Sequence, residues 1–551
     1  MKLALRGAIV VDGTGSPWTD SDVLVTDGTI TEVGDIPKGA ADQDIDLTGL
    51  VLAPGFIDPH THYDAQVLWD RDLTPSSWHG VTTVVMGNCG FGIAPASPAG
   101  RELVMRTLEN VEGMPLEALR AGIPWTFESF PEYLDAVDAE PSRCNVAALF
   151  GHTPLRFHVM GEQATERAAT GDEVGRMRDL LLEGMRAGAI GFSTSRSESH
   201  RGAFGRPVPS RLAELSEIWT LAGGMGATGK GTIEATWGPD FHVEECARLA
   251  ADIGRPVTWA AIMVVRDNPT MSADLERRVA AAGGAGTSVF PQVACRPIVA
   301  QVTLADPAPL ANVPAFGEIL ALERSARAAL YADPAWRERA YAGVREKWGN
   351  KLDEATVQET DLHAELRDGP TLGQLAAQRG GTALDVAVDL ALAENLATRF
   401  RIVMINDDEE QVGRLLRNPS MLLGLSDAGA HTSQLCDANF ATYLLQRWVR
   451  ELGVLTLEKA VWRLTGQPAQ VYGLTGRGRI APGAVADLVA FDPATVGTGP
   501  LERIVDLPGG ADRLVAPSAG IEHVWVGGQQ TRVDGKDIPG ARHGRVLRGG
   551  A

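Results

Sequence analysis

The sequence predicts an α/β fold in which a (β/α)8 TIM barrel stands beside a composite β-sandwich formed by both ends of the chain. Three observations support this prediction. The chain has 551 residues, several times the typical domain of about 150 residues. Short strands separated by turn signals occupy both ends. Strands and amphipathic helices alternate through the middle, as they do in a parallel barrel.

Both ends of the chain have the pattern of short strands joined by tight turns. Near the N-terminus, the segments LALRGAIVV, DVLVT and TITEVGD are separated by Asp-Gly turn signals. Near the C-terminus, ADLVAFDP, IEHVWVGGQQ and TRVDGKD show the same pattern. We therefore expect residues 1–54 and 475–551 to form one β-sandwich domain, and residues 55–474 to form the catalytic barrel.

Apolar segments in the middle of the chain are expected to be the strands of the barrel. Two of the amphipathic stretches between them, 172–186 and 241–253, are followed at once by Gly188 and Gly254, which are typical helix ends. An open doubly wound sheet is the alternative arrangement. The expected strands span residues 55–58, 81–86, 145–150, 189–194, 232–236, 256–262, 287–293 and 421–426.

Residues 305–401 form an insertion between the seventh and eighth expected strands. Asp333 can cap a helix that begins at Pro334, a residue suited to the first helical turn. Apolar residues then recur every four positions, at Trp336, Ala340, Val344 and Trp348. We expect a largely helical insertion that serves either as a lid or as a buttress.

Composition and charge exclude several classes of partner. The chain has 50 basic and 70 acidic residues, a formal charge of −20, whereas nucleic acids and anionic membranes require a basic patch. No apolar run reaches the roughly 18 residues of a membrane span, and Arg6 and Asp12 interrupt any signal-peptide core. The odd number of scattered cysteines does not indicate a disulfide framework. We expect a cytoplasmic protein that acts on a small molecule. A homo-oligomer is compatible with the sequence.

The strongest chemical signal is PGFIDPHTHYD, where an apolar strand runs into His60 and His62. Residues i and i+2 of an extended segment point the same way. Both imidazoles should therefore face the C-terminal mouth of the barrel, where active sites of this fold lie. Two imidazoles from one strand are a ready pair of metal ligands. The alternative is a chance pair of histidines in a polar loop.

Two further segments place a reactive side chain directly after an expected strand. In GNCGFG, Cys89 could bind a metal as a thiolate, although a free cysteine is more often a small buried apolar residue. In MLLGLSDAGAH, Asp427 could bind a metal and accept a proton from activated water, or could simply cap a helix. His431 follows four residues later.

Together these motifs resemble the amidohydrolase superfamily, and within it the D-aminoacylase group of N-acyl-D-amino-acid deacylases. The resemblance rests on VxDGTG, LAPGFIDPHTHYD, GNCG, GAIGFSTS, SDAGAH and RGRIAPGAVADLVAFDP. It implies a metal site made of His60, His62, Cys89 and Asp427, with Asp427 as the general base and acid. The element GHTPLR makes His152 a candidate substrate or oxyanion contact, and a satisfied core histidine is the alternative reading.

The chain departs from the pattern of that family at two ligands. The resemblance implies further metal-binding histidines after strands five and six, but GTIEATWG and PVTWAAIMVV contain none. The remaining histidine pair and Asp427 are expected to hold one divalent ion per chain, with zinc as the best guess, and Cys89 is a fourth ligand or idle. A metal-free or rearranged site and a binuclear site with other ligands are the alternatives.

The predicted function is metal-dependent hydrolysis of a carbon–nitrogen amide bond in a small molecule, as in an N-acyl-D-amino-acid deacylase. Arg196 and Arg296 are candidates for binding a substrate carboxylate, or else surface residues. The apolar residues Trp237, Trp259 and Ile262 near the absent histidines indicate a drier pocket than in relatives. The alternatives are a deaminase or cyclic-amide hydrolase with a mononuclear site, and a degenerate barrel that binds a ligand without catalysis.

Overall fold

The computed structural model describes residues 1–283, 288–320 and 322–549. These residues fall into two compact units, each with its own apolar core. The larger unit comprises Met1–Arg296, Asp408–Thr432 and Cys436–Ala551, and the smaller comprises Pro297–Asp407 and Ser433–Leu435.

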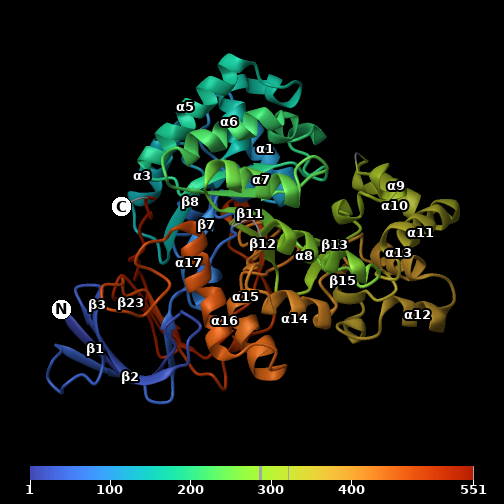
Figure 1. The fold of residues 1–551 in the computed structure, drawn as a ribbon. Helices are drawn as coiled ribbons and strands as arrows, with labels where there is room; N and C mark the ends of the chain where they lie inside the picture. Colours follow the sequence, from blue (N-terminus) through green and yellow to red (C-terminus); the bar gives the residue numbers. More distant parts are fainter. Residues whose placement is uncertain (284–287, 321, 550–551) are drawn as a thin grey trace. The chain divides into compact units, whose positions relative to one another are not determined.

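A sheet of eight parallel strands forms the centre of the larger unit, and the predicted TIM barrel is confirmed (Figure 1). Hydrogen-bonded neighbours follow chain order from the first strand to the eighth. A bridge between Thr61 and Ala428 joins the segments that follow these two strands. The strands are β6 (Phe56–Asp58), β7 (Val81–Met86), β8 (Asn145–Gly151), β9 (Gly191–Ser195), β10 (Thr232–Thr236), β11 (Val257–Ala260), β12 (Val289–Val293) and β16 (Leu422–Leu423).

Most observed strands coincide with or lie within the predicted segments. β7 and β10 have the predicted bounds. The segment expected at 287–293 begins at a residue outside the described part of the chain. The eighth strand is much shorter than expected, because Leu425 and Asp427 adopt left-handed backbone angles, with φ of 60° and 45°, that cannot continue a strand. The chain therefore turns away from the strand direction just before Asp427.

The helices around the barrel end at the residues that the sequence indicates. α5 (Gly171–Ala187) ends at Gly188, and α7 (Val243–Ile253) ends at Gly254 in the left-handed conformation. Figure 1 shows α5, α6 and α7 outside the strands. The other helices of this unit are α1 (Arg101–Glu112), α2 (Leu116–Gly122), α3 (Phe130–Asp138), α4 (His152–Met160), α6 (Leu215–Gly226), α8 (Pro269–Gly283), α14 (Glu409–Arg417), α15 (Phe440–Tyr443), α16 (Leu457–Leu464) and α17 (Gly466–Tyr472).

Strands from both ends of the chain join in one nine-stranded sheet, as the patterns at the two ends predict. β5 (Val51–Pro54) pairs parallel with β1 (Lys2–Val10) and antiparallel with β17 (Leu488–Phe491). The two ends consequently share an apolar core. The domain boundaries expected at residues 54 and 475 stay a prediction. The other strands are β2 (Thr19–Thr26), β3 (Thr29–Gly34), β4 (Gln43–Asp46), β22 (Ile521–Val526), β23 (Gln529–Val533) and β24 (Lys536–Asp537).

The smaller unit contains helices together with an antiparallel sheet of β13 (Ile298–Thr303), β15 (Arg399–Ile405) and β14 (Thr356–Glu359). The helix predicted from the tryptophan spacing is α11 (Pro334–Trp348). The carboxylate of Asp333 accepts a hydrogen bond from the Ala335 N–H at 3.0 Å, and all four residues of the predicted apolar stripe are buried. The other helices here are α9 (Pro314–Gly317), α10 (Arg324–Tyr331), α12 (Leu372–Arg379) and α13 (Ala383–Ala393).

None of the helices in the described part of the chain combines the length and the apolar character that a membrane span requires.

Candidate metal centre

His60 and His62 lie just beyond the carboxyl end of β6 and are both almost fully buried. The centroids of their rings are 5.4 Å apart, and the two ring planes are inclined at 68°. The Ser426 hydroxyl donates to the Asp58 carboxylate at 2.7 Å and to the His60 carbonyl at 2.9 Å. These bonds attach the end of the first strand to the loop after the eighth strand. The histidine pair is thereby held on a rigid part of the barrel.

Cys89 belongs to a short turn after β7 and has a φ of 56°. Its Sγ lies 3.4 Å from His60 Nε2. His60, His62 and Cys89 place their donor atoms within 4.8 Å of one another. Burial and nearby carboxylates raise the pKa of the Cys89 thiol well above its usual value, and a bound cation would reverse this effect. Imidazole and thiolate ligands together suit zinc.

Gln292, on β12, determines which nitrogen of His60 faces the site. Its Oε1 lies 2.7 Å from His60 Nδ1. Because an amide oxygen can only accept, Nδ1 carries the proton and Nε2 presents its lone pair toward Cys89. Burial also lowers the pKa of His60 and of His62, which keeps both in the neutral form that binds metals.

Asp427 closes the site from the loop after the eighth strand. Its Oδ1 lies 3.2 Å from His60 Nε2 and 3.9 Å from His62 Nε2. The His62 N–H donates to the Ala428 carbonyl at 2.7 Å, which ties this loop to the histidine segment. The Asp427 side chain is 31% exposed, so its carboxylate can reach both a bound ion and a substrate.

The residues present fit a metal ion. Two ligands of one tetrahedral zinc, with bonds of about 2.1 Å, lie about 3.4 Å apart. The contacts of His60 Nε2 with Cys89 and Asp427 are 3.4 and 3.2 Å. Neither ring nitrogen of His62 has a hydrogen-bond partner among the described residues. A buried polar atom without a partner is costly, and a metal bond would satisfy one of the two.

Two buried glutamates at the site were not anticipated from the sequence. Glu234, on β10, accepts a hydrogen bond from the Cys89 N–H at 2.6 Å, and burial raises its pKa to about 8. Glu112, the last residue of α1, places Oε2 3.5 Å from His62 Nε2. The sequence did hold a signal for Glu234, because it is the one charged residue of its strand, TIEAT. Glu112 offered none, because glutamates are common on amphipathic helices.

A cavity of about 210 Å³ opens beside these side chains. Its wall combines the candidate metal ligands with the residues of two loops and of the fifth and sixth strand ends. The lining consists of His60, His62, Cys89, Val111, Glu112, Ser197, Ser199, His200, Thr236, Trp237, Ala260, Ala261, Met263, Leu425, Asp427 and His431.

Apolar residues line the cavity after the fifth and sixth strands, and one part of the prediction for this wall was wrong. Trp237 lines the cavity as expected and is 41% exposed. Trp259 and Ile262 are instead buried in the core, and Ala261 forms the wall. Side chains alternate between the two faces of a strand, and Trp259 points toward His242 at the start of α7, with ring centroids 5.7 Å apart.

His152 lies in the core and does not line the cavity. Its Nδ1 is 2.9 Å from Thr194 Oγ1, and its Nε2 is 2.8 Å from Glu217 Oε1. Arg156 also pairs with Glu217. Because both ring nitrogens are engaged, the geometry favours the satisfied core histidine over the predicted substrate contact.

The two candidate carboxylate-binding arginines are also engaged in structural contacts outside the cavity lining. Arg196 pairs with Asp240 and donates to the carbonyls of Ser210, Arg211 and Ala213. Arg296 pairs with Asp437 at 2.9 Å and donates to the Asn439 side chain. Neither arginine is among the residues that line the cavity beside the candidate ligands.

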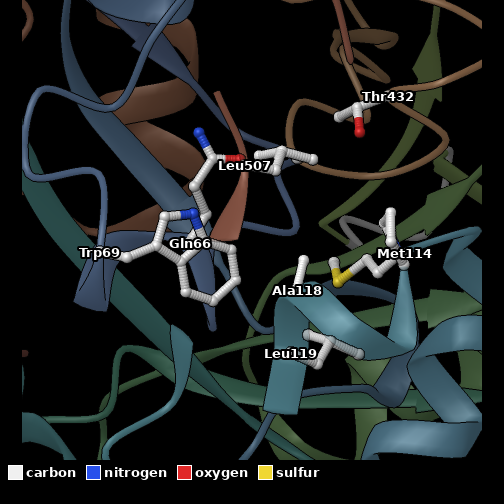
Figure 2. Close-up of a pocket in the computed structure, with 9 residues that line it drawn as sticks. Gln66, Trp69, Met114, Ala118, Leu119, Thr432 and Leu507 are labelled. Atoms are coloured by element: carbon white, nitrogen blue, oxygen red, sulfur yellow. The ribbon is translucent and has the colours of Figure 1, made fainter. Parts of the chain in front are cut away.

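Figure 2 shows a small enclosed pocket beside the loop that follows Asp427. Its volume is about 20 Å³, room for a single water molecule. Mostly apolar side chains form its wall, and Thr432 comes from the loop itself. The pocket is too small for a substrate. Its lining residues are Gln66, Trp69, Met114, Pro115, Ala118, Leu119, Gly429, Thr432 and Leu507.

An eight-stranded barrel with histidine, cysteine and aspartate donors at the carboxyl ends of its strands has the architecture of a metal-dependent hydrolase. The chain belongs to the Amidohydrolase family, whose match covers residues 43–532. It is thus a hydrolase of carbon–nitrogen bonds other than peptide bonds. The resemblance inferred from the motifs is confirmed.

Similar proteins agree with this assignment. The chain is 31% identical to a D-aminoacylase of Alcaligenes xylosoxydans xylosoxydans, over 99% of this chain and 97% of that one. A solved D-aminoacylase with a binuclear metal centre is 29% identical, covers 99% of both chains and has a TM-score of 0.67. An N-acyl-D-glutamate deacylase of Bordetella bronchiseptica, solved with zinc and a phosphonate mimic of the tetrahedral intermediate, is 28% identical over 99% of both chains, with a TM-score of 0.66. These similarities support a divalent metal cofactor.

Proposed function

We propose that this protein hydrolyses the amide bond of N-acylated small molecules, with N-acyl-D-amino acids as the first substrate class. The observation that carries the proposal is the convergence of His60, His62 and Cys89 within 4.8 Å. Asp427 lies beside them, 3.2 Å from His60 Nε2, and the group opens into a cavity. The similar D-aminoacylase and N-acyl-D-glutamate deacylase support the substrate class.

We infer one catalytic zinc per chain, held by His60, His62 and Cys89 with Asp427 beside it. When bound, such an ion lowers the pKa of a water molecule toward neutrality and polarises a substrate carbonyl. Gln292 keeps Nε2 of His60 unprotonated through the 2.7 Å bond to Nδ1.

Asp427 transfers the proton in this proposal. As the general base, its carboxylate accepts a proton from the attacking water, and it then delivers that proton to the leaving nitrogen. Asp427 has a left-handed backbone, with a φ of 45°, in the turn that follows the eighth strand. The hydrogen bond from the Ala428 N–H to Ser426 Oγ, 3.1 Å long, holds this turn.

The proposal is tested by replacing Asp427 with asparagine. With the metal restored to saturation, kcat for a hydrolysed N-acyl-D-amino acid should fall by at least about 10³-fold, the size of a strong general-base contribution. Far-UV circular dichroism should stay unchanged. Asp408→Asn, which alters a helix cap, is the matched control and should retain wild-type kcat. An Asp427→Asn protein that keeps a tenth of wild-type turnover would rule out this role.

The lining of the cavity favours a second candidate substrate class. Among the described residues that form its wall there is no lysine or arginine, whereas Glu112 and Asp427 are both present. A substrate carboxylate would meet like charges there, so cyclic amides and aminated heterocycles suit the wall better. A panel of N-acyl-D-amino acids, cyclic imides and aminated heterocycles decides between the classes by their relative kcat/KM. The first substrate class falls if only the uncharged ring compounds are hydrolysed.

A further inference from the structure

His200 is a cavity-lining histidine to which the proposed reaction gives no role. It lies in the loop after β9 and lines the same cavity as His60, His62 and Asp427. Its Nδ1 lies 2.7 Å from the Oγ of Ser195, which is fully buried and outside the cavity lining. Because the two nitrogens lie on different sides of the ring, Nε2 faces away from Ser195 and toward the cavity. Nε2 makes no hydrogen bond with a described residue and is not enclosed, so a bound ligand can reach it.

Ser195 determines which ring nitrogen of His200 carries the proton. Its Oγ already accepts a hydrogen bond from the Ser197 N–H at 3.3 Å. A buried hydroxyl needs an acceptor for its own proton, and among the described residues His200 Nδ1 is the acceptor that lies within reach. Ser195 therefore donates to Nδ1, and the proton of the neutral ring is on Nε2. His200 consequently presents an N–H donor to the cavity.

The loop and a neighbouring aromatic ring hold His200 in place. The His200 carbonyl accepts hydrogen bonds from Arg211 Nη1 at 3.2 Å and from the Val208 N–H at 3.4 Å. The imidazole packs against the buried ring of Phe91, with centroids 5.4 Å apart and planes inclined at 45°. A donor that is fixed in advance stabilises developing charge without having to reorient during the reaction.

Close packing of two segments fixes His200 relative to the candidate metal centre. Phe91, which supports the His200 ring, follows Cys89 by two residues. Gly90 lies between them, and a Cβ atom at Gly90 would lie 2.8 Å from Thr194 Cα and 3.0 Å from the Ser195 nitrogen. The turn that carries Cys89 is therefore in direct backbone contact with the end of β9, from which the loop of His200 starts.

The carbonyl oxygen of an amide substrate is the atom that a neutral N–H donor suits best. This oxygen accepts hydrogen bonds, and it gains negative charge when water attacks the carbon beside it. Two serines of the same loop are less suited as donors, because the hydroxyls of Ser197 and Ser199 bond to each other at 2.8 Å and Ser199 is exposed. The ring of His200 has its other nitrogen engaged and its position fixed.

We propose that the Nε2–H of His200 donates a hydrogen bond to the carbonyl oxygen of the scissile amide, and that Ser195 holds the ring in the tautomer that this bond requires. The bond strengthens as the oxygen gains negative charge, and the proton stays on Nε2, so that proton transfer is left to Asp427. His200 is then a catalytic residue and Ser195 a positioning residue. The inference rests on the proposed function, since it takes an amide as the substrate of this cavity.

The test compares two substitutions of nearly equal size at His200. His200→Met removes the donor, whereas His200→Gln keeps a side-chain N–H group. With a hydrolysed amide, His200→Met should lower kcat by about 10²- to 10³-fold, the effect of losing one such donor, and should change KM little. His200→Gln should recover at least about tenfold of that loss. Both variants should keep the zinc content of the wild type in elemental analysis. His158→Met, in α4 and outside the cavity lining, is the matched control and should keep wild-type kcat.

Two further measurements separate a donor from a merely structural residue. A phosphonate analogue of the substrate, which carries the negative charge of the attacked carbonyl, should bind His200→Met more weakly by the factor by which kcat/KM falls. Ser195→Ala should lower kcat by about tenfold in the wild type and by less than about twofold in His200→Met, because Ser195 acts through His200.

The outcomes distinguish this inference from the function on which it rests. A zinc-loaded His200→Met protein with wild-type kcat, or a His200→Gln protein no more active than His200→Met, overturns the donor role and leaves the hydrolase standing. Equal losses from Ser195→Ala in both backgrounds overturn the role of Ser195. A zinc-loaded wild type that hydrolyses no amide of the substrate panel overturns the inference and the proposed function together.

Discussion

Replacement of Gln292 by methionine tests how the barrel prepares His60 for a metal. Methionine has nearly the same length and volume but cannot accept a hydrogen bond. Gln292 Nε2 has no hydrogen-bond partner among the described residues, so the substitution removes the single 2.7 Å bond to His60 Nδ1. Without that acceptor the ring proton can move to Nε2, which lies 3.2 Å from Asp427 Oδ1. Metal binding must then displace that proton.

The size of the effect follows from the cost of this bond. A buried polar group left without its partner costs about 1–3 kcal/mol, which corresponds to about 5- to 150-fold in a dissociation constant. Loss of a residue that orients a metal-binding histidine typically costs about 10- to 100-fold in affinity. We therefore expect the zinc Kd of Gln292→Met to rise by about 10- to 100-fold.

The assay is competition for zinc with a chromophoric chelator near neutral pH. Gln411→Met is the matched control, because Gln411 is also a buried glutamine whose Oε1 accepts one hydrogen bond, from Ser272 at 2.8 Å. Because Gln411 Nε2 also donates to the Asp408 carboxylate at 2.8 Å, that variant should lose at least as much stability and keep the wild-type zinc Kd. A folded Gln292→Met protein whose zinc Kd stays within about twofold of the wild type would refute the role assigned to this hydrogen bond.

Three further predictions concern other parts of the larger unit. Gly113→Ala, with its Cβ 3.0 Å from His431 Nδ1 at a left-handed φ, should lower the free energy of unfolding by about 1–3 kcal/mol in urea titrations. Burial lowers the pKa of His79 to about 3; its contribution to stability is therefore complete above about pH 6.5 and is lost as the pH falls toward 3. Between about pH 7 and 4.5 the wild type should lose about 2–3 kcal/mol more than His79→Gln. Arg196→Met should lower the melting temperature and leave the ratio of KM values for charged and uncharged substrates unchanged.

Each of these predictions has an outcome that contradicts it. An alanine variant of Gly113 as stable as the wild type would mean that α1 and the loop of His431 can separate at no cost. Parallel pH profiles for the wild type and His79→Gln would show that His79 does not titrate differently in the folded and unfolded states. If the KM of Arg196→Met rises only for carboxylate-bearing substrates, Arg196 binds the substrate carboxylate in addition to its contacts with Asp240 and three carbonyls.

Local patterns predicted the elements of this fold well. Alternation of strands and helices, with glycines after α5 and α7, indicated the barrel, because helix ends and strand periodicity are properties of short segments. The eighth strand was overestimated, since the left-handed turns at Leu425 and Asp427 leave no trace in an apolar run. The sheet in the smaller unit was missed because its strands pair across a long stretch of chain.

The motifs of the sequence were sufficient to predict the fold class and the family. They also predicted the candidate donors His60, His62, Cys89 and Asp427, because each of these follows a strand and the parallel strands of a barrel all end at the same mouth. The positions of other side chains relative to that mouth became clear only from the folded chain. It placed Glu112 beside His62 and Glu234 beside Cys89, and it engaged His152, Arg196 and Arg296 in contacts of their own. These placements could not be predicted because the position of a residue along the chain limits only which strand end it approaches, whereas its hydrogen-bond partners come from segments far away in sequence. Those partners decide whether a charged side chain is free to meet a substrate.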